Sequence, residues 1–212
     1  DYGIPFHLET TVTRIHGRDR LEGVTVAKID KDRAPIPRTE RFVACDTLLL
    51  AVGLIPENEL SRGAGVEIHP VTGGPVVNDR LQTSQPSIFA AGNVVIVYLV
   101  DNVSHEGLKA GENAARYARG ELPDTDCAIP VRGGENVRLF SPQYVLGTSD
   151  VTIYLRVARP FEHPCRVFAN PDLYSQKLRY ARPGEMNEVH LMAERIRGLP
   201  KRTEIVVDAE AL

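Results

Sequence analysis

Residues 83–120 constrain the fold more than any other stretch of the chain. Residues 87–91 are uncharged and mostly apolar, which is typical of a strand buried on both faces of a mostly parallel sheet. Gly92-Asn93 follows, and a helix is predicted over residues 104–119, with Ser104 as its N-cap and Gly120 as its stop. Because ligands bind beyond the carboxyl ends of strands in such sheets, Asn93 is expected at the edge of a ligand site.

The predicted helix has an unusual face of small residues. Its members fall at helical spacings and are Gly107, Gly111, Ala114, Ala115 and Ala118. Each glycine inside a helix costs about 1 kcal/mol relative to alanine, so the small face needs a reason. Two interpretations stay open at this point: close approach of a flat cofactor or another backbone, and tight packing of the helix with no ligand.

This stretch resembles a motif of a known family. Thr83, residues 88–93, Glu106-Gly107 and Ala114-Ala115 resemble the second flavin-contacting motif of the FAD-dependent pyridine nucleotide-disulfide oxidoreductases. That family usually ends the strand with Gly-Asp, and the aspartate binds FAD. Asn93 stands in its place here, which keeps a hydrogen bond and loses the charge.

A second segment resembles the same family. Residues 45–58 are similar to the segment in which the family's chain leaves the NAD(P)H domain and re-enters the FAD domain. The resemblance covers about residues 4–120. It implies that the backbone amides at the helix start, with their positive dipole end, face the pyrimidine edge of the flavin. The cofactor-binding residues it implies are Gly53, Ala91, Gly92, Asn93, Val103, Ser104, His105 and Gly107.

The resemblance implies hydride transfer from NAD(P)H to FAD and onward to an acceptor. The sequence has no GxGxxG turn, which normally binds the diphosphate of these cofactors. We therefore expect the C-terminal part of a larger flavoprotein, inactive without its N-terminal half or a partner subunit. Whether it forms a homo-oligomer stays open.

The fold class expected is an α/β fragment followed by an all-β, sandwich-like module. Residues 1–122 are assigned to the end of an NAD(P)H domain plus the C-terminal segment of a FAD domain, and residues 123–212 to the β module. An antiparallel meander is expected at 6–15, 21–29 and 41–45, then a short helix at 58–64 and a strand at 75–78. The β module is predicted to have strands at 137–145 (broken by Pro142), 151–157, 165–169, 177–181, 188–192 and 203–207.

Composition limits the function classes. The net charge of −3 gives no sign of nucleic-acid binding, and no apolar run approaches the roughly 20 residues of a membrane span. Cys45, Cys127 and Cys165 lie too far apart for a redox pair or a metal-ligand pattern, which favours free thiols and a cytoplasmic setting.

No residue of the sequence is assigned a catalytic role, and no metal site is expected. The alternative to an enzyme segment is a non-enzymatic assembly or docking module with a remnant flavin fold. Asn93 in place of the family's aspartate is the best support for that alternative.

Overall fold

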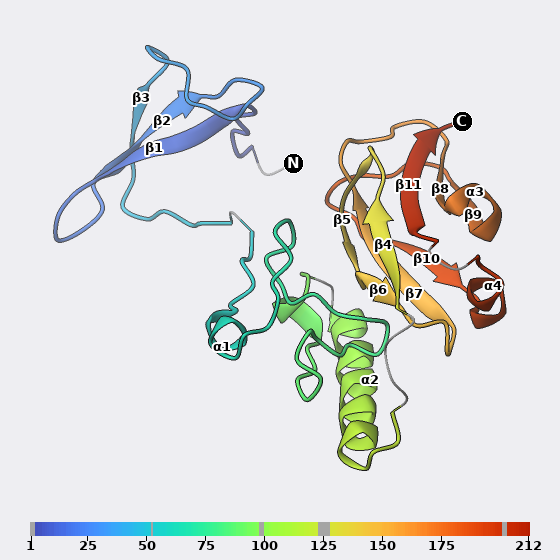
Figure 1. Cartoon of the computed structure of the whole chain (residues 1–212). Helices are drawn as coiled ribbons and strands as arrows, with labels where there is room; N and C mark the ends of the chain where they lie inside the picture. The colour runs from blue at the N-terminus through green and yellow to red at the C-terminus, as the bar shows by residue number, and fades with distance from the viewer. Residues whose placement is uncertain (1–2, 52, 98–99, 123–127, 201–202) are drawn as a thin grey trace. The chain divides into compact units, whose positions relative to one another are not determined.

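The computed structural model describes residues 3–51, 53–97, 100–122, 128–200 and 203–212 (Figure 1). Contacts divide the chain into two units, Asp1–Gly53 and Leu54–Leu212, which are described separately. The predicted domain boundary at 122/123 falls inside the second unit, beside residues 123–127, which lie outside the described residues. That boundary stays a prediction.

The first unit is a three-stranded antiparallel sheet. Its strands are β1 (Thr10–His16), β2 (Gly23–Lys28) and β3 (Arg41–Ala44), in the order β1-β2-β3. The central strand pairs with both neighbours, so that Val24 lies opposite Ile15 on one side and Val43 on the other. The predicted meander is confirmed.

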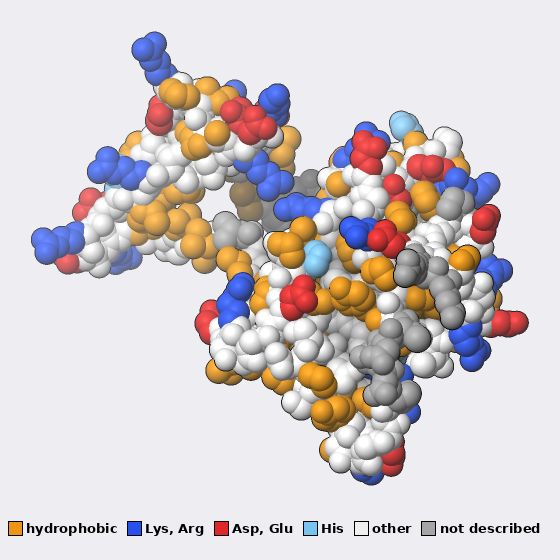
Figure 2. All heavy atoms as spheres, in the orientation of Figure 1, with side chains coloured by type: hydrophobic (Ala, Val, Ile, Leu, Met, Phe, Trp, Pro, Cys, Tyr) orange, Lys and Arg blue, Asp and Glu red, His pale blue; other side chains and the backbone are white. Residues whose placement is uncertain are grey.

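Apolar side chains are numerous on the surface of the first unit, as Figure 2 shows. Ile4, Phe6, Leu8, Ile15 and Phe42 are all exposed. A sheet of three short strands buries little apolar area unless a second layer covers it. The described residues of this unit supply no such layer.

The second unit begins with helices and turns. They are α1 (Glu59–Gly63), the 3-10 turn η1 (Gly92–Val94) and α2 (Val100–Ala118). The helix predicted at 58–64 is confirmed by α1. The stop of α2 is confirmed too, because Gly120 has φ +71° and its N–H donates to Tyr117 O. The next N–H, of Glu121, donates to Arg116 O, which completes a glycine-terminated helix end.

The start of α2 differs from the prediction. The helix begins at Val100, four residues before Ser104, so the assignment of Ser104 as N-cap is wrong. The side chain of Ser104 is exposed on the second turn of the helix. The sequence preference of serine for N-caps does not decide this boundary, because cap preferences are weaker than the packing of the whole helix.

The strand predicted at residues 87–91 is also wrong. Phe89 makes an isolated antiparallel bridge with Gln82, and Ala90 N–H donates to Leu81 O, without a continuous ladder. The strand predicted at 75–78 likewise consists of isolated bridges, among them Val77 with Thr83. A buried parallel strand needs neighbouring strands, and the described residues supply only isolated bridges here, of which Asn78 with Tyr144 is parallel.

The rest of the second unit is mostly β structure. One sheet has the order β10-β7-β5, and the other has the order β6-β4-β11-β8-β9 with β4 and β11 parallel. The strands are β4 (Ile129–Gly133), β5 (Val137–Ser141), β6 (Tyr144–Val145), β7 (Val151–Val157), β8 (Cys165–Ala169), β9 (Tyr174–Leu178), β10 (Asn187–Leu191) and β11 (Ile205–Ala211). Two short helices, α3 (Asn170–Leu173) and α4 (Ala193–Arg197), complete it.

Both sheets contribute to one apolar core. Ile153 and Leu155 from β7, Val189 from β10, and Val167 and Val207 from the other sheet are almost completely buried in it. In β7 the buried residues alternate with half-buried ones, as the sequence pattern predicts. The expectation of a β-rich C-terminal part is confirmed, while its narrower description as sandwich-like stays a prediction.

The predicted strands of this part differ in accuracy. Strands 151–157 and 165–169 are confirmed with the same bounds, and Pro142 does break the stretch between β5 and β6. The strand predicted at 177–181 is displaced, because β9 ends at Leu178 and Ala181 makes only a bridge with Phe161. The sequence reading missed β4, which contains a proline and a glycine.

The β-rich part packs directly against the segment that carries Gly92-Asn93. Val77 N–H donates to Gln143 Oε1, and Gln143 N–H donates to Val77 O, each at 2.9 Å. Arg156 Nη2 donates to Val97 O at 3.1 Å. A second, smaller core joins residues of both parts: Val77, Leu81, Ala90, Val95 and Ile96, with Leu139, Tyr154 and Met186 against them.

Among the described residues, no helix combines the length and apolar character that a membrane crossing requires.

Candidate functional site

The turn at residues 91–94 has a shape that requires glycine. Ala91 is extended, with φ −145° and ψ 156°, and Gly92 follows with φ +72°. A Cβ on Gly92 would lie 3.0 Å from Val103 Cγ1 of α2, and a positive φ is unfavourable for other residues. The predicted glycine therefore lets the chain turn tightly against the first turns of α2.

Hydrogen bonds hold both polar backbone groups of Gly92. Its N–H donates to Glu106 Oε2 at 2.9 Å, and its carbonyl accepts from Val95 N–H at 2.9 Å. Gly92 is buried, whereas Asn93, the next residue, is exposed. The turn thus presents Asn93 at the surface on a fixed backbone.

The helix start only partly matches the expected ligand-facing amides. Val103 is half-buried and is the fourth residue of α2, while Ser104 and His105 are exposed and one turn into the helix. In an α-helix only the first four N–H groups lack an internal partner. The expectation that the backbone amides of Ser104 and His105 face a cofactor is therefore wrong. Contact of their side chains with a cofactor stays a prediction.

The small face of α2 is open. Gly107 and Gly111 are exposed, and a Cβ built on either would meet nothing within 4 Å. These two glycines are therefore not needed for close packing of α2 against other described residues. Close approach of a flat cofactor or of a second backbone to these two glycines stays a prediction.

One predicted site residue, Gly53, belongs to a different unit from the 91–94 turn. It is the last residue of the first unit, has φ +97°, and a Cβ there would meet nothing within 4 Å. The remaining seven predicted residues lie on η1, on the residue before it, and on the first half of α2.

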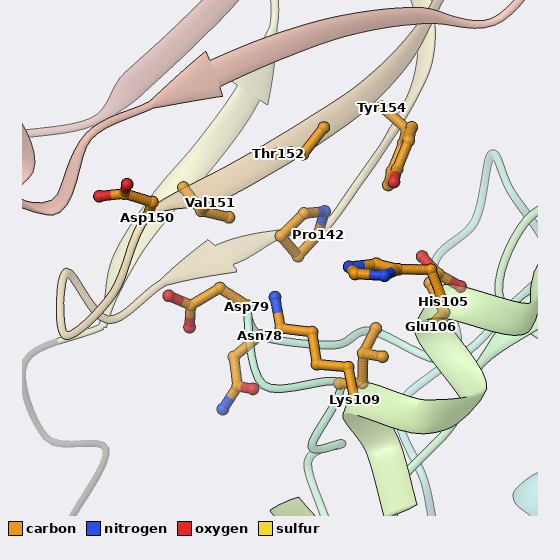
Figure 3. Close-up of a pocket in the computed structure, with 11 residues that line it drawn as sticks. Asn78, Asp79, His105, Glu106, Lys109, Pro142, Asp150, Val151, Thr152 and Tyr154 are labelled. Carbon is orange, nitrogen blue, oxygen red and sulfur yellow. The ribbon is translucent and has the colours of Figure 1, made fainter. Parts of the chain in front are cut away.

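A cavity of about 120 Å³ lies beside this turn, between α2, residues 78–81 and β7 (Figure 3). Its polar lining includes both acidic and basic groups, and Figure 3 shows Lys109 extending from α2 toward Asp79 and Pro142. Polar side chains that line the cavity include Asp79, His105, Glu106, Lys109, Thr152 and Tyr154.

Asp79 is the most deeply buried of these charges. It is 2% exposed, and in the part of the chain that the structure describes neither carboxylate oxygen has a partner within ordinary hydrogen-bond geometry. Burial raises the pKa of Asp79, and the nearby backbone N–H of Leu146 and the charges of Lys109 and Arg80 offset only part of this effect. The ionised carboxylate therefore costs stability where it stands.

Asp79→Asn is expected to stabilise the chain more at pH 7 than at pH 4, because the folded-state pKa of Asp79 is raised. A carboxyl group with a raised folded-state pKa binds its proton more tightly in the folded state. Its contribution to stability is therefore lost as pH rises from the unfolded pKa through the folded one. Urea unfolding at both pH values measures the difference. The exposed Glu135→Gln serves as control, and equal effects of Asp79→Asn at the two pH values would contradict the prediction.

Sequence reasoning missed Glu106 and Asp79. Glu106 reads as an ordinary acidic residue near a helix start, and its bond to Gly92 spans fourteen residues. Asp79 lies in a polar turn, and its burial depends on β7 and the loop at Leu146. Both roles arise from contacts between distant residues, and no local pattern signals them.

Two of the three cysteines lie among the described residues. Cys45 and Cys165 are free thiols, and burial raises the pKa of Cys165, as expected for a core residue; Cys127 lies outside the described residues. Among the residues that the structure describes, no group of three or more His, Cys, Asp or Glu side chains is placed to hold a metal ion.

Comparison with known proteins identifies relatives of the chain. Residues 1–118 match the model of the pyridine nucleotide-disulphide oxidoreductase family. Nitrite reductase [NAD(P)H] of Bacillus subtilis is 31% identical over 146 residues, which is 68% of this chain and 15% of that protein. The nitric oxide reductase FlRd-NAD(+) reductase of Klebsiella pneumoniae is 44% identical over 74 residues, which is 35% of this chain and 18% of that protein.

A third relative is named for electron transfer. The assimilatory nitrate reductase electron transfer subunit of Bacillus subtilis is 28% identical over 129 residues, 60% of this chain and 14% of that protein. The chain therefore matches less than a fifth of the length of each of these three relatives.

Proposed function

Because the chain belongs to the pyridine nucleotide-disulphide oxidoreductase family, we propose that it supplies the flavin-contacting turn of a flavin-dependent NAD(P)H oxidoreductase. In this proposal residues 1–122 are an α/β segment of the nucleotide-binding domains, and residues 123–212 are a sandwich-like module attached to it. The single observation that carries the proposal is the Gly92-Asn93 turn, held against α2 with Asn93 exposed.

The residues present fit a flavin in two respects. Asn93 offers an exposed amide for a sugar hydroxyl or a phosphate, and Gly107 leaves open the space that a Cβ would fill. Asn93 and the start of α2 bind and orient the cofactor, with the side chains of Ser104 and His105 at its edge. FAD, when bound, accepts a hydride from NAD(P)H and passes the electrons to an acceptor.

The rest of the cofactor needs groups that this sequence lacks. Without a GxGxxG turn, no glycine-rich loop in the chain can bind the diphosphate, so a further segment or a partner subunit supplies it. The electron-transfer names of the relatives support a separate acceptor for the electrons. A reducing, cytoplasmic setting is part of the proposal and rests on the free thiols of Cys45 and Cys165.

A visible-absorbance titration with FAD tests the proposal. The 212-residue chain alone is expected to stay colourless. Joined to a polypeptide encoded beside it that carries two GxGxxG turns, it is expected to bind FAD and to be reduced by NAD(P)H. Failure of that assembled protein to bind FAD would favour the alternative, a non-enzymatic docking module with a remnant flavin fold.

Gly107→Ala distinguishes the effect of Gly107 on the stability of α2 from its proposed contact with FAD. In the chain alone the variant is expected to raise the free energy of unfolding by up to about 1 kcal/mol, because alanine is the better helix former and meets no neighbour. In the assembled protein it is expected to weaken FAD binding severalfold. Gly63→Ala, also at an open helical position, is the control. If Gly107→Ala leaves the FAD affinity of the assembled protein unchanged, Gly107 is not part of the cofactor site.

A further inference from the structure

The carboxylate of Glu106 is buried where acidic side chains are usually exposed. Glu106 lies on α2, is 5% exposed, and accepts the Gly92 N–H through Oε2 at 2.9 Å. Such a hydrogen bond to a charged acceptor is stronger than one between neutral groups. It joins α2 to the turn that presents Asn93.

This hydrogen bond links the turn directly to α2. Gly92 is a flexible residue with φ +72°, so its backbone has many alternatives unless its polar groups are fixed. Its carbonyl is bonded within η1, by the N–H of Val95, and so sets the shape of the turn itself. Its N–H is bonded outside the turn, and the acceptor is Glu106 of α2.

The β-rich part closes over the same carboxylate. Glu106 lines the cavity of Figure 3 together with Tyr154 of β7 and with Lys109, one turn further along α2. Tyr154 also packs against the core that contains Val95 and Ile96, directly after the turn. The negative charge of Glu106 is close enough to contribute to the raised pKa of Tyr154, after burial and Glu188.

We propose that Glu106 is a positioning residue for the cofactor: by holding the Gly92 N–H under the cover of β7, it sets where Asn93 points. The effect on the cofactor rests on the proposed function. The effect on the turn does not, because both Gly92 and Glu106 lie in this chain. It gives the β-rich part a role, which is to shield this bond from water.

Amide hydrogen exchange at Gly92, measured by NMR on the 212-residue chain, tests the first half of the proposal. Glu106→Ala removes the acceptor and is expected to lower the protection of the Gly92 N–H about tenfold or more. Glu106→Gln keeps an oxygen acceptor of the same length and is expected to lower it less than threefold. Glu112→Ala, an exposed glutamate on the same helix, is the matched control and should leave Gly92 unchanged.

Two results would overturn the positioning role. One is unchanged protection of Gly92 in a folded Glu106→Ala chain, and the other is an equal loss in Glu106→Gln and Glu106→Ala. If near-UV circular dichroism shows that Glu106→Ala does not fold, Glu106→Asp replaces it. Aspartate keeps the charge but is one carbon shorter, so the proposal again expects lower protection at Gly92.

FAD binding by the assembled protein tests the second half. Glu106→Ala is expected to weaken FAD binding about tenfold and to shift the flavin reduction potential, with Glu106→Gln in between. If the unmodified assembly binds FAD and both variants bind it equally well, the positioning role is wrong and the proposed function stands. If the unmodified assembly binds no FAD, the proposed function fails, while the exchange result at Gly92 still decides whether Glu106 holds the turn.

Discussion

Gly74→Ala is expected to lower the free energy of unfolding of the Leu54–Leu212 unit by about 3 kcal/mol. A Cβ at this position would overlap the carbonyl group of Val95 and lie 2.7 Å from Val94 O. Both neighbours are backbone atoms at the end of η1, so no side chain can rotate away to make room. Urea unfolding followed by circular dichroism measures the loss.

The same substitution is expected to disturb the candidate site. Gly74 lies in a hairpin whose backbone is bonded across it, with His69 N–H donating to Gly74 O at 2.8 Å. Asn58 fixes this hairpin to the turn, because its Nδ2 donates both to Gly73 O at 2.8 Å and to Val94 O at 3.1 Å. Moving the two backbones apart therefore displaces η1, and with it Asn93.

A glycine in open surroundings serves as the control for Gly74. Gly184→Ala adds the same methyl group in a turn where a Cβ would meet nothing within 4 Å, and it is expected to change stability by less than about 0.5 kcal/mol. A Gly74→Ala chain as stable as Gly184→Ala would show that the hairpin and η1 are not held as closely as the structure places them.

The sequence predicts the C-terminal strands well where the pattern is local. Strand β7 alternates apolar and polar residues, and its bounds, Val151–Val157, match the prediction. Strand β4, Ile129–Gly133, is not predicted. It forms by parallel pairing with β11, more than seventy residues away along the chain. Pairing at that separation leaves no periodic signal in a short strand that contains Pro130.

The candidate site likewise contains residues that local sequence signals predict and residues that depend on distant contacts. Gly92 and Asn93 are predicted from the family resemblance and from a strand at 87–91 that the structure lacks. The structure shows a positive φ at Gly92 and an exposed Asn93, and their place in a cofactor site stays a prediction. The error over Ser104 has a similar cause, since a good N-cap residue is a local signal that the longer helix overrides. Glu106 and Asp79 are not predicted, because they line a cavity together with residues of β7, which no local pattern connects to α2 or to residues 78–81.

Leu155→Ala is expected to cost about 3 kcal/mol of unfolding free energy, because a fully buried leucine loses its packing and leaves a cavity. Leu155 lies on β7, opposite Asn187 of β10 and Phe140 of β5, and in the core shared by both sheets. Thermal or urea unfolding of the chain measures the effect. Leu108→Ala, at a position 70% exposed on α2, is the control and should cost less than about 1 kcal/mol.

The Leu155 variant also tests how far the site depends on the β-rich part. Tyr154, its neighbour on β7, faces the cavity and packs beside Val95 and Ile96. If β7 shields the bond between Glu106 and Gly92, loosening its core at Leu155 should lower the exchange protection of Gly92 under conditions in which the chain remains folded. If the exchange protection of the Gly92 N–H is the same in Leu155→Ala as in the unmodified chain, the turn is held without the β-rich part.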